Sequence, residues 1–388
     1  MNIGQKIGNE LHLFGKKKTN MWTLTKNKNW HEVEGQFTWV QAMRNVPQDV
    51  RYHAEGDVAV HTQMVINELQ KLKFFQARDL QTQEILWASA LLHDVEKRTT
   101  TCIEPDGSIT SHGHARKGEM TARQLLYCEI ATPFYLREII AKIVRHHGLP
   151  LWVLEKQNPQ KALLQASLEV NLSLVAAIAE ADVKGRICAD QEELLYKIDL
   201  FREFAAENRC LEQAKQFSSD LGKFLYFQKE ESSPEYEPFD TTNNQVIMLS
   251  GLPGTGKDRW IAKHCKDWKV ISLDAIRREL KIAPTDTQGT GQVVQMAKEM
   301  AKKYLRSHTP FVWNATNITR SLRAPLIDLF SSYGAKVKIV YLEVPYAQLI
   351  EQNNNREHIV PAAAMQRLIA KLEVPNLWEA HEVEYVVH

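Results

Sequence analysis

The sequence predicts a multidomain chain in which an all-α domain precedes an α/β domain with a parallel sheet. At 388 residues the chain is too long for one typical core. Apolar residues recur at helical spacing in the first part, whereas short apolar runs alternate with helical segments in the last part. The stretch 229–244 between them is rich in charge and contains Pro234 and Pro238, which is typical of a linker. We therefore predict an N-terminal arm at 1–28, a helical domain at 29–228, a linker at 229–244 and an α/β domain at 245–388.

The composition is that of an ordinary globular protein. Apolar residues make up 44% of the chain, charged residues 24%, and the net charge is +1. This balance excludes a uniformly basic nucleic-acid binder but leaves a local basic groove open. No apolar run reaches the length of a membrane span, and Lys16–Lys18 precede no signal-peptide core, so we expect a cytoplasmic enzyme without a membrane partner. Five scattered cysteines form no CxxC pair and predict reduced, structural thiols.

The first part of the chain reads as helices after a polar, lysine- and asparagine-rich arm that we expect to be flexible. The predicted helices are Val58 to Leu72, Gln83 to Leu92, Gly118 to Cys128, Tyr135 to Val144, Ala162 to Asp182 and Glu192 to Ala206. Few strands are expected here, and Pro105-Asp106-Gly107 predicts a turn.

The last part reads as strands of a parallel sheet separated by helices. The predicted strands are Val246 to Leu249, Val270 to Leu273, Phe311 to Trp313 and Val337 to Leu342. After the first of them comes a GxxxxGK loop, and a helical segment follows the loop. Glycines let backbone N–H groups turn toward phosphate oxygens, the helix N-terminus adds a positive dipole, and the lysine reaches the outer phosphates. The predicted nucleotide-binding residues are Gly251, Pro253, Gly254, Thr255, Gly256, Lys257 and Asp258.

The roles of two aspartates of this part stay open. Asp258 stands where Ser or Thr normally offers a hydroxyl to Mg²⁺, and its carboxylate contacts the ion directly, through water or not at all. Asp274 follows the second strand, and the carboxyl ends of parallel strands line the ligand crevice. Its carboxylate is either a base that accepts a hydroxyl proton or the N-cap of the next helix.

Histidines and aspartates form an ordered set in the helical domain. Single histidines on helices are usually surface or core residues, but these recur at the helix ends together with carboxylates. Imidazole and carboxylate groups are the ligands that borderline divalent metals prefer. The predicted metal ligands are His61, His93, Asp94, His114, His146, His147 and Asp182. His53 and His112 lie close by in the sequence and either contact substrate or exchange roles with a ligand.

This order of residues resembles the HD phosphohydrolase superfamily over roughly Trp30 to Phe227. The resemblance implies that one metal ion is held by His61, His93, Asp94 and Asp182, and a second by Asp94, His114, His146 and His147. It implies hydrolysis of a phosphoester by one or two divalent transition metal ions, of the Mn, Co, Ni or Zn type. Positive charge for a phosphate would come from Lys97, Arg98, Arg116 and Lys117, for which a solvated surface charge is the alternative.

The chain from about Gln245 to its end resembles the polynucleotide 5′-kinase family. The resemblance is carried by the GLPGTGK loop, Asp274-Ala275-Ile276-Arg277, Asn314-Ala315-Thr316-Asn317 and an arginine before Val360-Pro361. It implies ATP or another NTP with Mg²⁺, and a role for each of four residues. Lys257 would bind the donor phosphates, Asp274 would be the base for a 5′-hydroxyl, Arg277 would hold the acceptor and Arg356 would reach the donor from a lid.

The chain departs from this family at two positions. Gln352 replaces the first of two lid arginines, and Asn314 stands where relatives often have Asp. Arg320, Arg323 and Arg367 are further phosphate-binding candidates, with a plain surface role as the alternative for each.

Together the two halves resemble the HD-Pnk family of bacterial end-healing enzymes, over all but the arm and the linker. This resemblance implies phosphorylation of 5′-hydroxyl ends and removal of 2′,3′-cyclic, 2′- or 3′-phosphates from RNA ends, with Asp94 as the catalytic residue of the second reaction. RNA or DNA ends are the expected partners, and a ligase of the same repair pathway is another. Two alternatives stay open, which are a nucleotide phosphohydrolase with nucleoside kinase activity and a nucleotide-sensing module that does not hydrolyse its ligand.

Overall fold

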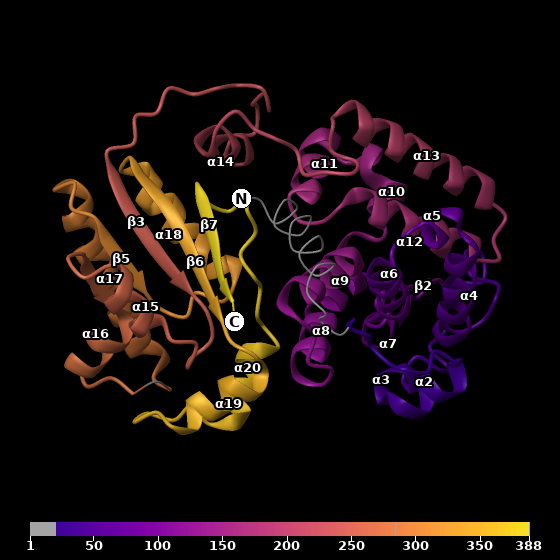
Figure 1. The fold of residues 1–388 in the computed structure, drawn as a ribbon, viewed down its shortest axis with the longest axis horizontal. Coiled ribbons are helices and arrows are strands. Elements are labelled where there is room, and N and C mark those ends of the chain that lie inside the picture. Colours follow the sequence, from indigo (N-terminus) through magenta and orange to yellow (C-terminus); the bar gives the residue numbers. More distant parts are fainter. Residues whose placement is uncertain (1–20, 284, 388) are drawn as a thin grey trace. The chain divides into compact units, whose positions relative to one another are not determined.

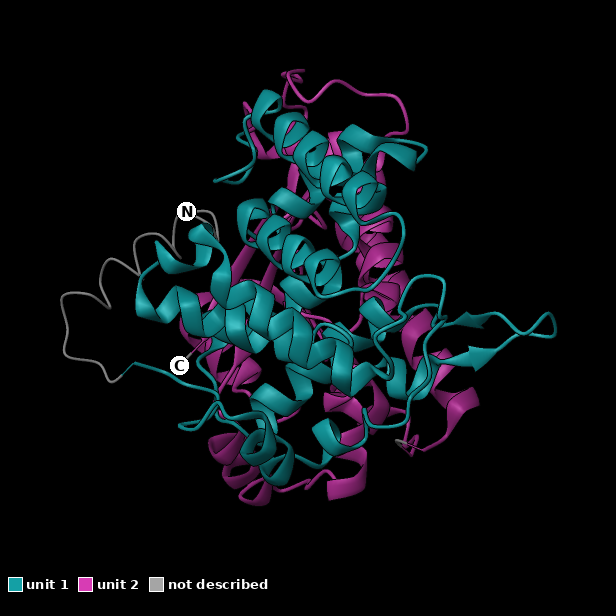
Figure 2. Cartoon of the chain, turned by 90° about the vertical axis from the view of Figure 1, so that its right-hand side faces the viewer, with its two compact units in different colours: residues 1–216 teal, residues 217–388 magenta. Residues whose placement is uncertain are grey.

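The computed structural model describes residues 21–283 and 285–387, and its contacts divide the chain into two compact units, Met1–Gln216 and Phe217–His388. Figure 2 shows the two units in different colours. The predicted fold class is confirmed, because the first unit is helical and the second is built on a parallel sheet. The division lies before α14 (Asp220–Gln228), so this helix belongs to the second unit although the sequence analysis places it with the first.

The first unit is a set of helices with one small hairpin. Its helices are α2 (Trp30–Gln36), α3 (Thr38–Gln41), α4 (Val58–Lys71), α5 (Lys73–Gln76), α6 (Leu80–Leu92), α7 (Lys97–Thr100), α8 (His114–Cys128), α9 (Phe134–His146), α10 (Leu149–Trp152), the 3₁₀ helix η1 (Val153–Glu155), α11 (Pro159–Ser167), α12 (Leu172–Lys184) and α13 (Gln191–Glu207). The hairpin pairs β1 (Cys102–Ile103) with β2 (Ile109–Thr110) around the predicted Pro-Asp-Gly turn and extends away from the helices (Figure 2).

The predicted helix Ala162 to Asp182 is wrong as a single element. The chain breaks between α11 and α12, which meet at a bend of 109°. The Asn171 side chain accepts a hydrogen bond from the Ser173 N–H and caps the new helix, which is why the apolar run does not continue as one helix.

The N-terminal arm differs from the expectation in its last residues. Residues 1–20 lie outside the described part of the chain. Leu24 is buried in the core of the first unit, and the Glu84 carboxylate of α6 accepts from its backbone N–H at 3.0 Å. Residues 21–28 therefore pack on the helical unit.

Close contact between α4 and α12 fixes the centre of the first unit. A Cβ atom on Gly185, at the end of α12, would come within 2.8 Å of the Val65 backbone nitrogen of α4. Only glycine permits this approach. It brings His61 of α4 and Asp182 of α12 side by side, within a core in which Val65 and Ile178 are fully buried.

The second unit has a five-stranded, all-parallel sheet in the order β4-β5-β3-β6-β7. Its strands are β3 (Asn244–Ser250), β4 (Lys269–Ser272), β5 (Phe311–Asn314), β6 (Ala335–Glu343) and β7 (Glu382–Val387), and its other helices are α15 (Lys257–His264), α16 (Leu273–Glu279), α17 (Thr287–Arg306), α18 (Arg320–Ser332), α19 (Tyr346–Asn354) and α20 (Ala362–Ile369). Helices pack on the sheet (Figure 1).

The strand order places the phosphate loop at the middle of the sheet. β3 is the central strand, with β5 on one side and β6 on the other. The four predicted strands are confirmed, and their carboxyl ends carry Gly251, Asp274 and Asn314 to one edge. The sequence analysis missed β7, an edge strand in which glutamates interrupt the apolar residues.

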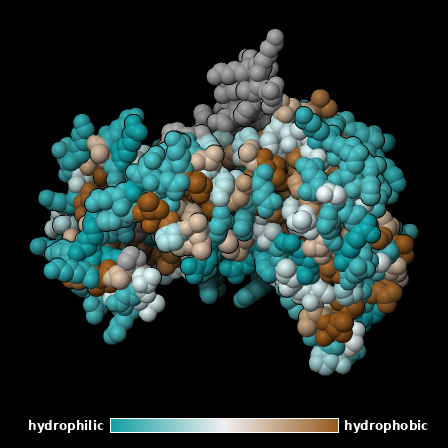
Figure 3. Space-filling view, turned by 90° about the horizontal axis from the view of Figure 1, so that it is seen from below, coloured by the Kyte–Doolittle hydropathy of each residue, from teal (hydrophilic) through white to brown (hydrophobic). Residues whose placement is uncertain are grey.

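The surface is mainly hydrophilic with scattered apolar side chains (Figure 3). Val50 is 70% exposed, Ile103 66% and Phe239 86%. Within the described residues no single helix is long and apolar enough to span a membrane, and α11 with α12 passes that test only as a bent pair.

Candidate functional sites

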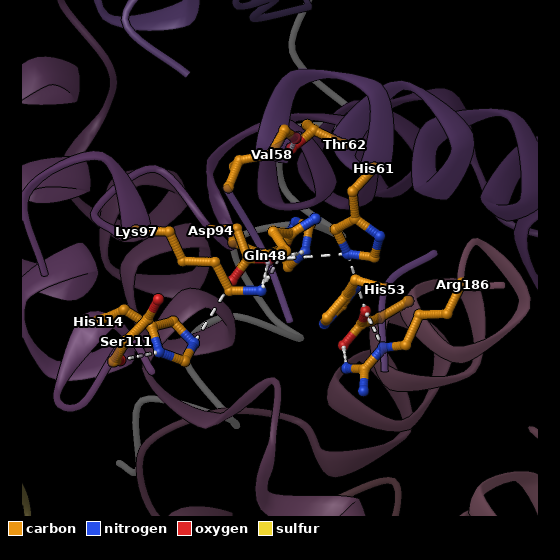
Figure 4. A network of polar contacts seen from close by, with 12 residues as sticks. Gln48, His53, Val58, His61, Thr62, Asp94, Lys97, Ser111, His114 and Arg186 are labelled. Carbon is orange, nitrogen blue, oxygen red and sulfur yellow. Dashed lines mark hydrogen bonds and ion pairs between the residues drawn. The ribbon is translucent and has the colours of Figure 1, made fainter. Parts of the chain in front are cut away.

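The first site is a cluster of imidazoles and carboxylates in the helical unit. It forms because helix ends converge there. His61 lies on α4 and Asp182 on α12, His93 and Asp94 follow α6, His114 opens α8 and His147 follows α9. All except His114 are buried. His61 and Asp182, which are 121 positions apart in the chain, thus share one interior site. Figure 4 shows part of this site, with His61, Asp94 and His114 labelled.

Three groups of possible ligand atoms lie here among the described residues, and two of them consist of predicted ligands alone. His61, His93 and Asp182 form the first, and Asp94, His114 and His147 form the second, with the atoms of each group within 4.8 Å of one another. The remaining group joins His61 to His53 and Glu55. Asp94 joins the first two groups, because its Oδ2 lies 3.2 Å from His93 Nε2 and its Oδ1 lies 3.4 Å from His114 Nε2. In the first group His61 Nε2 lies 3.1 Å from Asp182 Oδ1.

Local hydrogen bonds orient these imidazoles. The Nδ1 atoms of three histidines contact backbone carbonyl oxygens: those of His93, His114 and His147 lie 2.7, 2.8 and 2.8 Å from Ala90, Ser111 and Val144. Each such Nδ1–H donates to its carbonyl, so the lone pair of Nε2 faces the cluster. This is the arrangement by which outer contacts orient metal-ligating histidines.

The fourth imidazole, His61, uses a carboxylate instead. Its Nδ1 lies 2.7 Å from Glu55 Oε1. Burial works against the charge of Glu55, but its close contacts with the imidazoles of His53 and His61 lower its pKa below the usual range. The sequence analysis missed Glu55, because only the fold reveals that this loop residue reaches α4.

Two cations balance the buried carboxylates. Lys97 Nζ lies 2.8 Å from Asp94 Oδ2 and donates to Gln48, and the Arg186 guanidinium donates to both oxygens of Asp182. Burial opposes the charged state of both aspartates, but Lys97 and Arg186 hold the pKa of each well below its usual range. Burial lowers the pKa of His147 to about 3, so this imidazole is neutral.

The donor set fits a divalent metal ion. Among the described residues, both ring nitrogens of His61, His93 Nε2 and Asp94 Oδ1 are buried polar atoms without a hydrogen-bond partner. His114 Nε2 and His147 Nε2 face each other at 3.3 Å, and with both Nδ1 protons donated elsewhere two lone pairs meet there. Unpaired buried acceptors are costly unless a cation binds between them. Nitrogen and oxygen donors of this kind suit Mn, Co, Ni or Zn.

The structure separates His146 from the other predicted ligands. Its Nε2 lies 3.0 Å from Glu169 Oε2, in an ion-pair network with Lys142 and Glu119. Because consecutive residues at a helix end point in different directions, His147 enters the cluster and His146 does not. His53 does lie beside the cluster, since its ring centre is 4.7 Å from that of His61, whereas His112 is exposed.

The charged candidates around this site also divide. Lys97 contacts the cluster directly. Arg98 and Lys117 instead pair with Glu96, and Arg116 is exposed.

The second site is the phosphate loop of the α/β unit. Gly251, Gly254 and Gly256 have positive φ angles of 152°, 91° and 86°. A Cβ atom on Gly251 would lie 2.4 Å from the Leu342 carbonyl oxygen of β6, so no other residue fits. Gly256 precedes α15, whose first N–H groups have no partner within the helix and are available to an anion.

Lys257 folds back over this loop. Its Nζ donates to the Gly251 and Leu252 carbonyl oxygens at 2.9 and 2.8 Å. Burial lowers the pKa of Lys257 to about 8. A phosphate group would restore full protonation, because it would supply the negative charge that this buried ammonium group lacks.

The two aspartates of this unit occupy different settings. The Asn314 amide donates to Asp258 Oδ1 at 2.7 Å, so the residue in the Ser/Thr position is held by the end of β5. The interpretation of Asp274 as an N-cap is wrong, because the Ser272 side chain caps α16 by accepting from the Ala275 N–H. The Asp274 side chain is instead 72% exposed at the carboxyl edge of the sheet.

The predicted arginines take different roles. Arg277 Nη1 lies 3.6 Å from Asp274 Oδ1. Arg277 Nε and Arg356 Nη1 are buried without hydrogen-bond partners among the described residues, so each is able to donate to a bound anion. Arg323 is not, because it is fully buried and pairs with Glu379 at 2.7 Å. Arg367 is exposed and donates to the Ala363 carbonyl of its own helix.

Arg320 and Gln352 complete the predicted positions of this unit. The Arg320 guanidinium stacks on the Trp378 ring at 4.4 Å. Gln352 lies on α19, next to Asn353. The Asn353 side chain donates to the Val360 carbonyl and accepts from the Val360 N–H. These two hydrogen bonds hold the segment that contains Arg356.

Comparison with protein families assigns the second unit. A family model described as an AAA domain matches residues 246–375, from β3 to beyond α20. Together with the parallel sheet and the glycine loop, this match makes the unit a kinase-like P-loop domain. Such a domain uses a nucleoside triphosphate and Mg²⁺.

Relatives of known name match only parts of the chain. The multifunctional CCA protein of Methylococcus capsulatus is 32% identical over 113 residues, which are 29% of this chain and 24% of that protein. The heterogeneous nuclear ribonucleoprotein U-like protein 2 of Mus musculus is 24% identical over 148 residues, 34% of this chain and 20% of that protein. The chain thus spans about a quarter or less of the curated relatives it matches.

Solved structures also resemble only part of the chain, somewhat more than a third of it. A putative kinase from Chloroflexus aurantiacus shares 16% identity, covers 38% of this chain and 86% of its own, and has a TM-score of 0.32. The Pnkp1/Rnl/Hen1 RNA repair complex shares 17% identity over 36% of this chain and 47% of that chain, with a TM-score of 0.31.

Proposed function

We propose that the chain is a bifunctional enzyme that heals nucleic-acid ends. Its α/β unit transfers the γ-phosphoryl group of ATP or another NTP to a 5′-hydroxyl end. Its helical unit removes 2′,3′-cyclic, 2′- or 3′-phosphates from RNA ends. The products are termini that a ligase of the same repair pathway joins.

The kinase part of the proposal rests on Asp274. Its carboxylate is free of a capping role, exposed, and placed at the sheet edge that also carries the phosphate loop. A free carboxylate so placed is suited to accept the proton of an acceptor hydroxyl. Arg277 lies within 3.6 Å and would hold the acceptor's phosphate, while Lys257 and Arg356 would neutralise the donor phosphates.

The phosphoesterase part rests on the unpartnered Nε2 and carboxylate atoms of the buried cluster. His61, His93, Asp94 and Asp182 would hold one metal ion, and Asp94, His114 and His147 would hold another. A bound divalent metal ion supplies Lewis-acid activation of a phosphoester. The protein itself contributes a buried setting, the neutral imidazole of His147 and Lys97, which would orient and neutralise a phosphate oxygen beside Asp94.

A paired assay tests both activities. The protein is incubated with γ-labelled ATP and Mg²⁺ and either a 5′-hydroxyl oligonucleotide or a free nucleoside. We expect label on the oligonucleotide, and label on the nucleoside alone would favour small-molecule metabolism. The same protein, loaded with Mn²⁺ or Co²⁺, is given RNA with a 2′,3′-cyclic phosphate end. Nucleotide binding without release of phosphate would instead support a sensing module.

A further inference from the structure

The loop before α4 carries a carboxylate with two imidazole partners. Glu55 Oε1 lies 2.8 Å from His53 Nδ1 and 2.7 Å from His61 Nδ1. The Glu55 side chain is fully buried, and its other oxygen accepts from the Ile187 N–H at 2.8 Å. The backbone of Ala54 and the carbonyl of Ile187 make a second bond, at 3.0 Å, so the loop that carries Glu55 is fixed on both sides.

This geometry fixes the tautomer of one ring and favours that of the other once an ion is bound. His53 Nδ1 is hydrogen-bonded to the Glu55 carboxylate, so it carries the ring proton and leaves the lone pair on Nε2. His61 lies between two carboxylates, with Nδ1 2.7 Å from Glu55 Oε1 and Nε2 3.1 Å from Asp182 Oδ1. If a metal ion took the Nε2 lone pair, the remaining proton of His61 would lie on Nδ1, facing Glu55.

His53 lies on the more accessible side of the same cluster. Its side chain is 11% exposed, whereas His61 and His93 are fully buried. The two rings beside Glu55 meet edge to face with their centres 4.7 Å apart, so His53 is the more exposed of two imidazoles in direct contact. A neutral imidazole with its proton on Nδ1 presents a hydrogen-bond acceptor there, and an acceptor is complementary to a hydroxyl group.

We propose that Glu55 is a positioning residue for both rings. It holds His61 in the tautomer that ligates a metal ion, and it holds His53 as an acceptor for the ribose hydroxyl next to the phosphate of a 2′- or 3′-phosphorylated RNA end. The second half rests on the proposed phosphoesterase function, whereas the first half concerns metal binding alone. In this role His53 distinguishes ribose from deoxyribose at the end that the helical unit processes.

The variant Glu55→Gln tests the first half. A glutamine must turn its NH₂ group either toward the two Nδ1–H groups or toward the Ile187 N–H, so one donor always faces another. We expect the affinity for Co²⁺, measured by equilibrium dialysis of the full-length chain, to fall about 10- to 100-fold. This is the typical loss when a residue that orients a metal ligand from outside is replaced. The visible absorption of bound Co²⁺ should change as well, because it reports the ligand set.

Glu68→Gln is the matched control, because Glu68 lies on α4 like His61 but pairs at the surface with Lys71. We expect it to bind Co²⁺ like the unaltered protein. If Glu55→Gln lowers the thermal midpoint but leaves Co²⁺ affinity and absorption unchanged, Glu55 is only a structural link to Ile187 and the first half is overturned. This readout needs no turnover, so a failure of the proposed function would not be mistaken for a failure of the positioning role.

The variant His53→Ala tests the second half. The ratio of kcat/KM for a ribose 3′-phosphate end to that for a 2′-deoxyribose 3′-phosphate end is measured with and without the substitution. We expect the substitution to reduce the ratio about two- to tenfold, which is the contribution of one neutral hydrogen bond. Co²⁺ affinity should stay unchanged. An unaltered ratio would overturn the role of His53 in reading the hydroxyl, and a loss of Co²⁺ binding would show that His53 serves the metal site instead.

Discussion

The two candidate sites differ in how far the protein alone completes them. In the helical unit, ligand atoms lie within 4.8 Å of one another and outer hydrogen bonds already orient the imidazoles. In the α/β unit, the loop is formed, but Asp274 is exposed and the buried nitrogens of Arg277 and Arg356 have no partner among the described residues. The proposed metal site is thus already arranged by the protein, whereas the proposed kinase site would be completed only when its substrates bind.

The difference follows from where the residues are attached. The ligands of the cluster come from helices packed in one core, such as α4 and α12, so core packing fixes their positions. The groups of the kinase site come from strand ends and from the segment after α19, where substrates must enter. Substitutions should therefore act through metal affinity and stability in one unit and through catalysis in the other.

The largest effect should come from Asp94→Ala. This carboxylate reaches both groups of metal ligands, so its loss should reduce phosphoesterase activity to background while the 5′-kinase rate stays unchanged. His93→Ala should act in the same way. Both rates are measured on the same preparation with labelled RNA ends. Loss of the kinase rate as well would mean that the two sites are not independent.

The next effect should come from Asp274→Asn, which keeps the shape of the side chain and removes the base. We expect kcat of the kinase to fall about 10²- to 10⁴-fold, as loss of a general base does, with little change in KM for ATP. Lys257→Ala should instead weaken the binding of ATP, because its ammonium group lies at the phosphate loop. Single-turnover phosphorylation and nucleotide titrations separate the two. An unchanged kcat for Asp274→Asn would assign the base elsewhere.

The metal-ligand cluster could be predicted because its residues stand at helix ends as His-Asp and His-His pairs. Sequence could not tell His146 from His147, since only the direction of each side chain at the end of α9 separates them. Nor could it reveal Glu55 or Arg186, whose roles depend on the packing of the loop before α4 against the chain after α12.

The same limit applies to the α/β unit. The four predicted strands and the phosphate loop were evident from apolar runs and glycine spacing. For Arg323 the sequence suggested either a phosphate-binding or a plain surface role, and neither fits a buried side chain whose partner, Glu379, is 56 positions away in the chain. The edge strand β7 was missed because Glu382 and Glu384 interrupt the continuous apolar run by which the other strands were recognised, although Lys336 and Lys338 of β6 pair with them.

A smaller effect, on stability, should follow from Arg186→Ala in the metal-free protein. The substitution leaves Asp182 as an uncompensated buried charge, which typically costs about 3–5 kcal/mol. Hydrogen exchange of α12 in increasing urea measures it. Excess Mn²⁺ or Co²⁺ should recover part of the loss, because the ion replaces the missing positive charge. Arg202→Ala is the control, since its pair with Glu180 is partly exposed and contributes about 0–1 kcal/mol. Equal losses in the two variants would contradict the special role of Asp182.

The smallest effect should be an acid sensitivity of the α/β unit that does not involve metal ligands. Burial lowers the pKa of His381 to about 4, and its Nδ1 accepts from the Val337 N–H while its ring stacks on Phe224. Between this value and the unfolded value of about 6.5 the unfolded chain binds more protons than the folded one, so stability rises with pH.

The stabilising contribution of neutral His381 is thus complete above pH 6.5 and is lost as the pH falls toward 4, by up to about 3 kcal/mol. His381→Asn keeps an acceptor for Val337 and cannot titrate, so it should flatten this slope even if it lowers stability at neutral pH. Urea unfolding at several pH values, followed by hydrogen exchange of β6, measures the slope. An equal slope in the variant would show that groups other than His381 cause the acid sensitivity of this unit.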